Sequence, residues 1–376
     1  MRIAIASSGL GHVARGIETW AADTASTLHQ AGSDVTLFSA DDKPAQAYEV
    51  CLPCWRRDDR LANRITKAMP GFSWRWGLKS KYGVEQFSFW LALRKQLKQK
   101  QFDILHVQDP MLAFWCNIWR RKGWLKTREI LGHGTEEPGE FLRRFPYVQQ
   151  LAPWHLEQSQ EELGEDAVHY WRAIPNFVDT KLFKPEEDGQ PNPYRSKFHI
   201  PEAALVLVSA AALKRHHKRC DIVIEAFGKL LHDWPSGQEK PWLLMAGAAT
   251  DDTPELRQLA DACGEGHIQL MTNLPRSEMP DFLRAGSAFV LGSLFEMMPI
   301  ALLEALATGL PLLVNNHPVM NWMAGKGGMP VDITTSSQLA SAMQNLLQKD
   351  KLEELSSAIN SNDKKLMVTR PKAKVE

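Results

Sequence analysis

Two glutamates eight positions apart, Glu296 and Glu304, are the residues of this sequence best suited to bind a polar ligand. Glu304 falls in an apolar stretch, residues 299–308, where its neighbours three and four positions away are mainly apolar or small. Because a carboxylate in such surroundings requires partners, this setting favours ligand binding. Glu296 lies just before the stretch, so both carboxylates can face one crevice. The alternative interpretation is an exposed helix residue at Glu304 and an acid at Glu296 that a helix dipole favours.

A strand, a loop and a helix, in that order, position the two glutamates. Ala288–Leu291 is an apolar run of strand length, residues 292–298 form a break, and residues 299–308 predict a helix. Pro299 suits the first helical position, and Gly309 with Pro311 provides a stop. The first turn of such a helix carries unpaired amides and the positive end of the helix dipole. It can therefore hold a phosphate beyond the carboxyl end of the strand.

A second feature is the basic run Lys-Arg-His-His-Lys-Arg at residues 214–219, which follows a predicted strand at 204–209 and precedes a predicted helix at 221–231. Cations at the carboxyl end of a strand suit a diphosphate. An exposed basic loop is the alternative interpretation. Further strands are expected at 242–246 and 267–271, and further helices at 278–285 and 338–347.

The beginning of the chain shows the opening of a doubly wound α/β domain. A strand at Arg2–Ala6 runs into a glycine-containing loop, followed by a predicted helix at 17–31 and a predicted strand at 33–39.

Gly9, Gly11 and Ala14 in this loop match the dinucleotide pattern G-x-G-x-x-G/A, and Asp41 or Asp42 follows the second strand as a ribose-binding acid. The pattern makes an NAD-dependent oxidoreductase an alternative function. A tight turn without a ligand is the simpler interpretation.

The segment around the two glutamates, SLFE followed by LLEALATGLPLLV, resembles the donor-sugar site of glycosyltransferase family 4, where the two form an E-x7-E pattern. The resemblance implies that Glu304 binds the ribose hydroxyls of a nucleotide sugar, that Glu296 contacts the donor sugar, and that the loop amides hold the diphosphate. Met297 and Met298 stand where the family usually has Gly-Phe, which bears on donor choice. They also motivate another alternative, a nucleotide-sugar-binding protein without transferase activity.

The same resemblance implies a role for the basic run at 214–219. Lys218 matches a family lysine, while Lys214 or Arg215 must replace an arginine that the usual spacing would place at Leu213. These cations would neutralise the leaving diphosphate without a metal ion.

The resemblance also covers the first half of the chain. Residues 15–18 resemble a G-G-x-E loop, with Arg15 in place of the first glycine, and residues 129–134 resemble the family segment in which His133 reaches the donor sugar. Glu136 and Glu137 follow as residues expected to bind the acceptor. The predicted catalytic residues are Glu296, His133 and Lys218, and the predicted donor-binding residues are Gly11, Gly16, Lys214, Arg215, Lys218, Met297, Met298, Pro299, Ile300 and Glu304.

The fold that the resemblance implies is α/β of the GT-B type, with two Rossmann-like, doubly wound domains facing a cleft. The chain length of 376 residues suits two domains. Residues 173–185 resemble the family's I-P-N-G-V-D element before the interdomain linker, with Phe177 in place of the glycine. We therefore predict an acceptor-side domain at 1–185, a junction at 186–192, a donor-binding domain at 193–350 and a polar tail at 351–376.

The implied activity is transfer of a hexose from a nucleoside-diphosphate sugar, such as a UDP- or GDP-sugar, to an unidentified sugar, lipid or small-molecule acceptor. The resemblance also implies that the anomeric configuration is retained. The nucleotide sugar is a co-substrate, and we expect neither a cofactor nor a metal.

Charge is unevenly distributed although the net charge is zero. Residues 55–128 hold 17 Lys plus Arg against 5 Asp plus Glu, a surplus of +12. Basic and aromatic residues interleave at 52–100 and in a predicted helix at 111–124, which suits an anionic lipid surface or an anionic acceptor. A solvated basic face with tryptophans turned into the core is the alternative interpretation. Nucleic acid is disfavoured because no nucleic-acid-binding module surrounds these residues.

The sequence also predicts the cellular compartment of the protein. It shows neither a signal peptide nor a membrane-spanning run, and a cytoplasmic protein with peripheral contact at the inner membrane face is expected. Cys51 and Cys54 form a C-x-x-C pair without the second pair of a zinc site, so free thiols are expected at all five cysteines.

Overall fold

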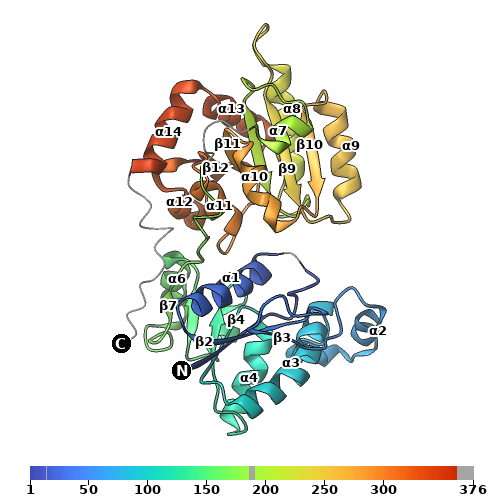
Figure 1. Ribbon diagram of the computed structural model, residues 1–376, viewed down its shortest axis with the longest axis vertical. Coiled ribbons are helices and arrows are strands. Elements are labelled where there is room, and N and C mark those ends of the chain that lie inside the picture. The colour runs from blue at the N-terminus through green and yellow to red at the C-terminus, as the bar shows by residue number, and fades with distance from the viewer. Residues whose placement is uncertain (14, 186–190, 362–376) are drawn as a thin grey trace. The chain divides into compact units, whose positions relative to one another are not determined.

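The computed structural model describes residues 1–13, 15–185 and 191–361 (Figure 1). The chain divides into two compact units, Met1–Asn176 and Phe177–Glu376. Three predictions touch residues outside the described ranges: Ala14 of the glycine loop, most of the junction at 186–192, and the end of the tail, 362–376.

The N-terminal unit contains a parallel sheet of seven strands in the order β3-β2-β1-β4-β5-β6-β7. The interior strand β1 pairs with β2 on one side and β4 on the other, through Ile3 opposite Val35 and Ile3 opposite Ile104. The strands are β1 (Arg2–Ala6), β2 (Asp34–Ser39), β3 (Glu49–Cys51), β4 (Ile104–Val107), β5 (Arg128–Gly132), β6 (Val148–Gln150) and β7 (Arg172–Ala173).

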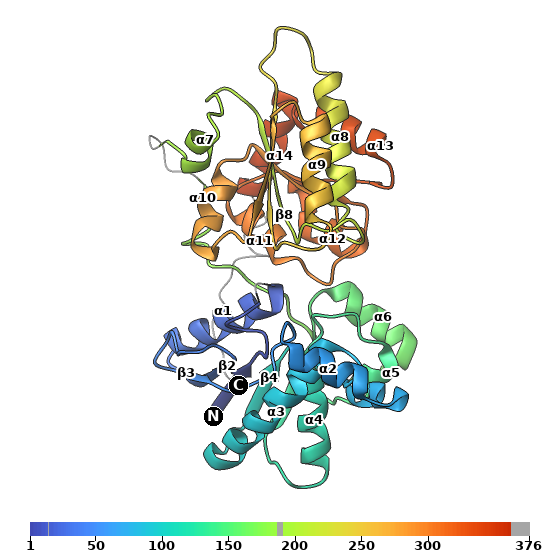
Figure 2. The same cartoon turned by 90° about the vertical axis from the view of Figure 1, so that its right-hand side faces the viewer.

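Helices cover this sheet because their apolar sides pack onto it. The longest, α3 (Lys81–Lys100), begins where the Ser80 side chain accepts a hydrogen bond from the Gly83 amide, and it buries Phe89, Trp90 and Leu93. Figure 2 shows α3 beside α4. The other helices are α1 (Gly16–Gln30), α2 (Arg60–Ala68), the 3-10 helix η1 (Gly71–Trp76), α4 (Pro110–Arg121), α5 (Gly139–Leu142) and α6 (Pro153–Leu163).

The C-terminal unit contains a parallel sheet of six strands in the order β10-β9-β8-β11-β12-β13. The first strand of the unit, β8, is again interior, and the chain winds outward from it in both directions. The strands are β8 (Val206–Ala210), β9 (Trp242–Gly247), β10 (Ile268–Thr272), β11 (Ala288–Leu291), β12 (Leu312–Asn315) and β13 (Gly328–Val331). Both units therefore have the Rossmann-like winding that the sequence predicts.

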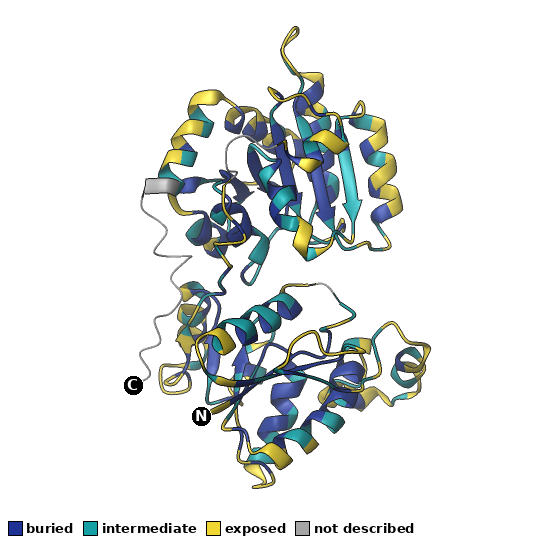
Figure 3. Cartoon of the chain, viewed as in Figure 1, coloured by how far each residue is buried: buried dark blue, intermediate teal, exposed yellow. Residues whose placement is uncertain are grey.

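The second core forms where α8 and α13 pack together on the sheet, and Phe227, Leu230 and Met343 are buried there. Figure 3 shows strands that are largely buried and helices whose outer faces are exposed. The helices are α7 (Pro193–Lys197), α8 (Cys220–His232), α9 (Thr253–Cys263), η2 (Arg276–Glu278), α10 (Met279–Arg284), α11 (Ile300–Ala307), α12 (Pro318–Ala324), η3 (Gly325–Gly327), α13 (Ser336–Leu346) and α14 (Lys349–Ser361).

Two details differ from the sequence-based expectation. Pro299 is the residue before the first helical residue of α11, not the first helical residue itself. The predicted polar tail at 351–376 begins as part of helix α14, in which Leu355 is buried. The apolar residues Leu352, Leu355 and Ile359 recur at helical spacing, and α14 packs on η3.

Among the described helices, none has the length and apolarity that crossing a bilayer demands.

Candidate active site

The carboxyl ends of β8 and β11 lie side by side in the C-terminal sheet, because the two strands are neighbours. After β8 the chain continues outward to β9, and after β11 it continues to β12 on the other side. Ligands of open α/β sheets bind where the strand order reverses in this way. The loop at 211–219 follows β8, and the loop at 292–299 follows β11.

Lys218 and Glu296 join these two loops. The Nζ of Lys218 donates to Oε1 of Glu296, and the Ser293 hydroxyl donates to the same oxygen at 2.7 Å. The Leu294 amide donates to the His217 carbonyl at 2.9 Å. The Lys218 side chain is 22% exposed and that of Glu296 14%, so both heads remain within reach of a ligand.

The close approach of the two loops depends on their backbones. His217 and Arg219 adopt left-handed φ angles of 70° and 48°, which turn the chain sharply before α8. Gly292 faces this turn, and a Cβ there would lie 2.8 Å from the Lys218 carbonyl oxygen and 2.7 Å from Val223 Cγ2. A side chain at Gly292 would push the loops apart, so this glycine is needed for close packing.

Glu304 lies on α11 and is 4% exposed. Its Oε1 accepts a hydrogen bond of 2.6 Å from Nη1 of Arg276, the first residue of η2. The sequence predicts that this carboxylate needs a partner, but not which residue provides it. Because a buried unpaired charge is costly, the pairing with Arg276 lowers the cost of burying the Glu304 carboxylate in an apolar helix.

Arg215 contacts acidic residues of its own unit. Its backbone amide donates to Asp252 at 2.8 Å, and its Nη1 donates to Glu255 at 2.6 Å. The hydrogen bond to Glu255 and the charge of Asp221 raise the pKa of Arg215. Lys214 is exposed, and Leu213 is buried in the core. Of the predicted phosphate-binding cations, the structure brings Lys218 to the switch point.

The remaining predicted donor-side residues gather at the amino end of α11. Met298 is buried, whereas Met297, Pro299 and Ile300 are half-buried. They follow Glu296 directly, so the loop amides and the first turn of α11 are close to the Lys218–Glu296 pair.

In the N-terminal unit, His133 follows β5 and is held by Gln150, the last residue of β6. His133 Nδ1 and Gln150 Oε1 are 2.7 Å apart, and Gln150 Nε2 donates to the Ser159 hydroxyl at 3.0 Å. Since Gln150 presents its oxygen, His133 donates through Nδ1 and keeps a lone pair on Nε2. Burial lowers the pKa of His133 despite the bond to Gln150 and the nearby backbone of Glu137. Within the described chain, Nε2 is buried without a hydrogen bond.

The glycine loop after β1 is filled by the side chains of its own unit. A Cβ at Gly9 would clash with the Glu18 carboxylate, and a Cβ at Gly11, where φ is 106°, would lie 2.5 Å from the Asp41 Cα. Asp42 pairs with Arg56 at 2.7 Å. Acidic residues of the protein therefore fill the space where the pyrophosphate of a dinucleotide would bind. This arrangement disfavours the alternative function of an NAD-dependent oxidoreductase. Gly16 is the first residue of α1.

A buried network that the sequence patterns do not indicate lies beside this loop. Glu85 is fully buried and accepts hydrogen bonds from His12 Nε2 at 2.9 Å and from the Arg57 amide at 2.8 Å. Burial alone would raise the pKa of Glu85, but the hydrogen bonds from His12 and from the Arg57 guanidinium and amide outweigh it and lower the pKa to about 2. Burial raises the pKa of Asp109 to about 6, against a hydrogen bond from Tyr82.

The predicted acceptor residues lie in the loop after His133. Glu136 is exposed, and Glu137 accepts a hydrogen bond of 3.0 Å from the Thr135 hydroxyl. Burial raises the pKa of Glu137. The residues that the structure describes include no group of three or more metal-ligating side chains.

Comparison with known proteins connects both units to one family. Residues 192–365 match the family model "Glycosyl transferases group 1", and residues 14–158 match "Glycosyltransferase Family 4". Alpha-monoglucosyldiacylglycerol synthase of Streptococcus pneumoniae is 24% identical over 345 residues, covering 85% of this chain and 72% of that protein.

Two solved structures share the fold. Sucrose-phosphate synthase from Thermosynechococcus elongatus aligns with a TM-score of 0.71 and 16% identity, over 95% of this chain and 92% of that chain. Anabaena HepE in complex with UDP and glucose aligns with a TM-score of 0.70 and 14% identity, over 98% and 95%. With a GT-B fold, two matching family models and a related enzyme over most of its length, the chain belongs to glycosyltransferase family 4 and is a sugar-transferring enzyme.

Proposed function

We propose that the enzyme takes its sugar from a nucleoside-diphosphate sugar, held by the C-terminal unit at the carboxyl ends of β8 and β11. The observation that carries this proposal is the pairing of Lys218 with Glu296 beside the amino end of α11. A cation and a carboxylate beside the first turn of a helix, at a strand-order reversal, suit a diphosphate. The complex of the structural neighbour HepE with UDP and glucose supports the same ligand class.

The chemistry follows from these groups. As the glycosidic bond breaks, negative charge develops on the diphosphate, and Lys218 with the amides of α11 stabilises it as fixed positive charge. This arrangement does not require a metal ion. Glu296 contacts the sugar and Glu304 the ribose, while Met297, Met298, Pro299 and Ile300 contact the diphosphate and sugar. Arg215 holds the loop at 211–219 in place through its hydrogen bonds to Asp252 and Glu255. Lys214 adds positive charge at the entrance of the donor site.

The proposed reaction is hexosyl transfer with retention of anomeric configuration. The retention follows from the family resemblance of the E-x7-E segment. Proton NMR of the first product formed from an α-linked nucleotide sugar tests it, because the anomeric coupling constant distinguishes an α from a β product. A β product would contradict retention.

We assign the acceptor to the N-terminal unit. Glu136 and Glu137 offer carboxylates for it. His133 keeps its predicted catalytic role at the donor sugar, which follows from the family resemblance. Contact of Gly11 and Gly16 with the donor stays a prediction. Asp41 occupies the space beside Gly11.

The N-terminal unit also carries a surface suited to peripheral contact with an anionic membrane. Between residues 60 and 81 the sequence has six basic residues and no acidic one. All six are exposed, as are Phe72, Trp74 and Trp76 of η1. Lysine, arginine and tryptophan together suit the headgroup region. By contrast, Trp115 and Trp119 of α4 are partly buried against the core, as the alternative interpretation of that helix predicts.

A cytoplasmic location fits the cysteines. All five are free thiols in the structure, as expected where the cell keeps thiols reduced.

One experiment separates the proposed transferase from its alternatives. Calorimetric titration with UDP-sugars, GDP-sugars and NAD should show binding of a nucleotide sugar and none of NAD. In the Glu296→Ala variant, nucleotide binding should persist while hydrolysis and transfer of the donor are lost. The exposed Glu239→Ala variant should match the wild type. Binding of NAD alone would favour the oxidoreductase, and absence of turnover in the wild type would favour a binding protein.

A further inference from the structure

A cavity of about 510 Å³ lies at the carboxyl ends of β2 and β3 in the N-terminal unit. The two strands are parallel neighbours with Ser39 opposite Cys51, so the loops that follow them meet at one edge of the sheet. The volume falls within the range of small-molecule sites, roughly 300–1,000 Å³. The ionisable side chains of the lining are Asp41, Asp42, Asp59, Arg56, Cys51 and Cys54.

The charged groups of the lining hold one another in place. Arg56 Nη2 donates to Oδ1 of Asp42 at 2.7 Å and to the Ala40 carbonyl at 3.1 Å. The Arg56 amide donates to Oδ2 of Asp59 at 3.1 Å, and the Asp42 amide donates to Oδ1 of Asp41 at 2.7 Å. Each of these bonds uses one oxygen of a carboxylate. Because an ionised carboxylate has about four acceptor positions, all three can also accept bonds from a ligand.

The net charge of the lining decides which ligand it suits. Three aspartates and one arginine give a charge of −2. The hydroxyls of a neutral sugar or polyol donate to carboxylates and accept from a guanidinium, so they match this lining. A phosphate ester carries about −1.5 to −2 charge at pH 7, and like charges brought together repel. Arg56 is already paired with Asp42, so it does not offset three carboxylates.

The cavity is separate from the loop that holds Glu136 and Glu137. In the strand order β3-β2-β1-β4-β5, three strand spacings, roughly 14 Å, lie between β2 and β5. Both places are nevertheless at the same edge of one sheet, because its strands are parallel. The cavity therefore adds a second binding position along the edge to which the acceptor is assigned.

We propose that this cavity binds a neutral sugar or polyol group of the acceptor and selects against phosphorylated acceptors. The inference rests on the proposed function, in which the N-terminal unit binds the acceptor. The selection concerns the cavity alone. The basic surface of α2 and η1, proposed to contact an anionic membrane, is made of other residues.

The test is saturation-transfer NMR on the full chain without nucleotide. The probes are glucose, galactose, mannose and myo-inositol, each compared with its own monophosphate ester. At least one neutral probe should bind, and its phosphate ester should bind about tenfold more weakly or worse because of the repulsion.

Two substitutions remove charge from the lining with little change of shape. Asp41→Asn and Asp59→Asn keep the size of each side chain and one oxygen. Each should weaken binding of the neutral probe several-fold, since a hydrogen bond to a charged group becomes one to a neutral group. In the double variant the preference for the neutral probe over its phosphate ester should be largely lost, because Arg56 then meets one carboxylate instead of three.

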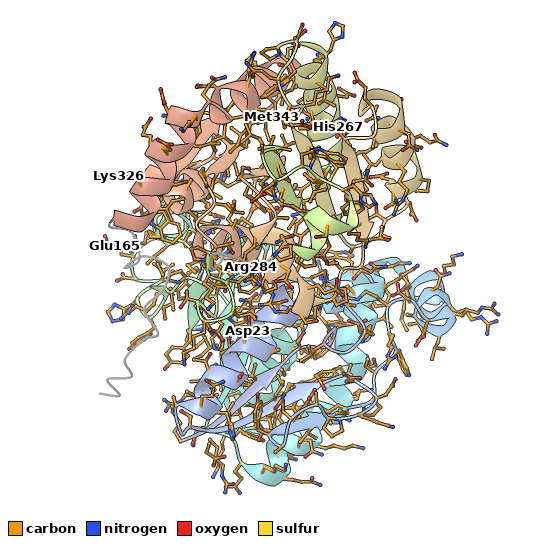
Figure 4. The ribbon with its side chains drawn as sticks, turned by 45° about the horizontal axis from the view of Figure 1, so that its top comes forward. Asp23, Glu165, His267, Arg284, Lys326 and Met343 are labelled. Carbon is orange, nitrogen blue, oxygen red and sulfur yellow. The ribbon has the colours of Figure 1, made fainter. Side chains whose placement is uncertain are left out.

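The matched control is Asp34→Asn/Glu165→Gln, which removes two exposed carboxylates of the same unit. Asp34 lies at the amino end of β2, and Glu165, labelled in Figure 4, follows α6. This variant should keep the wild-type affinity and preference. Circular dichroism and urea unfolding should show that every variant is folded.

Three results would overturn the inference: no binding of any neutral probe, equal binding of neutral and phosphorylated probes by the wild type, or the wild-type preference in the Asp41→Asn/Asp59→Asn variant. Calorimetric titration of the wild type with UDP- and GDP-sugars tests the proposed function separately. Failure of these nucleotide sugars to bind would overturn the proposed donor site, and with it the identification of the bound sugar as an acceptor.

Discussion

Lys218 and Glu296 come from loops 78 residues apart and share one hydrogen bond, and since an ammonium has three N–H donors, Lys218 can bind an anion while it keeps this bond. We predict that Lys218→Ala lowers affinity for UDP or GDP by about tenfold to a hundredfold, since it removes a charged hydrogen-bond donor. Unfolding by urea should change little, because Lys218 is partly exposed. Lys240→Ala, which removes a surface pair with Glu265, is the control. Unchanged nucleotide affinity in Lys218→Ala would contradict the diphosphate assignment.

Glu85 gives a second prediction at the scale of single residues. Its pKa of about 2 lies below the ordinary value of 4.5, so its contribution to stability is present above pH 4.5 and is lost as the pH falls toward 2. Glu85→Gln should therefore lower the free energy of unfolding by about 2 kcal/mol at pH 7, with a difference that narrows below pH 4.5.

Urea unfolding at pH 7 and at pH 3 checks this prediction. The control is Glu140→Gln, which removes an exposed pair with Arg143 and should change stability by less than about 0.5 kcal/mol. A deficit that is the same at both pH values would contradict the linkage to Glu85.

Sequence patterns located some site residues and not others for a physical reason. Glu296 and Glu304 lie on one strand-loop-helix unit, so local spacing places them, and Lys218 lies directly before a recognisable helix. Two of their partners, Arg276 for Glu304 and Glu255 for Arg215, come from the helices η2 and α9. Such pairs depend on how helices pack in three dimensions, which no spacing in one segment encodes.

At the scale of elements, α2 and η1 form the surface proposed to contact membranes. We predict that the full chain cosediments with vesicles containing anionic phospholipid and less with purely zwitterionic ones, and that salt weakens binding. Replacing Trp74 and Trp76, which are 65% and 45% exposed, with Ala should reduce the bound fraction several-fold without loss of folding.

The matched control for this surface is Trp124→Ala, an exposed tryptophan at the end of α4 that is 51% exposed. It should bind vesicles as the wild type does. Equal binding by the Trp74/Trp76 variant would show that the basic residues alone, or another surface, bind the membrane.

How well the sequence predicts a strand or helix depends on the length of that element. The apolar strands β1, β2, β8, β9 and β11 agree with the prediction to within about two residues, because several consecutive buried side chains leave a clear pattern. The strands β3, β6 and β7 have two or three residues each, which is too short for any periodicity. The sequence predicts a polar tail where α14 lies, because charged residues surround the few apolar residues of this helix.

At the scale of the whole molecule, each unit has its own buried core. We predict that UDP at a hundred times its dissociation constant stabilises the C-terminal unit by about 2.7 kcal/mol, which slows exchange of its core amides about a hundredfold. The largest protection is expected at 213–220 and 292–303, with β1 to β7 changed little. Hydrogen exchange with mass spectrometry measures this, and equal protection in both units would contradict it.

The overall winding was predictable because each unit opens with a strand, a loop and a helix. The position of the boundary between the two units was less predictable. The structure divides the chain after Asn176, whereas the polar run at 186–192 indicated a later junction. Breaker residues show where a chain is solvated, and the division between compact units depends on long-range contacts that composition does not record.

The strand orders bear on how this chain folds while the ribosome makes it. In each sheet the strand synthesised first, β1 or β8, lies in the interior, and every later strand adds to an edge that already exists. No strand has to insert between two others. Each sheet can therefore grow in the order of translation, and the first can be complete before the second begins.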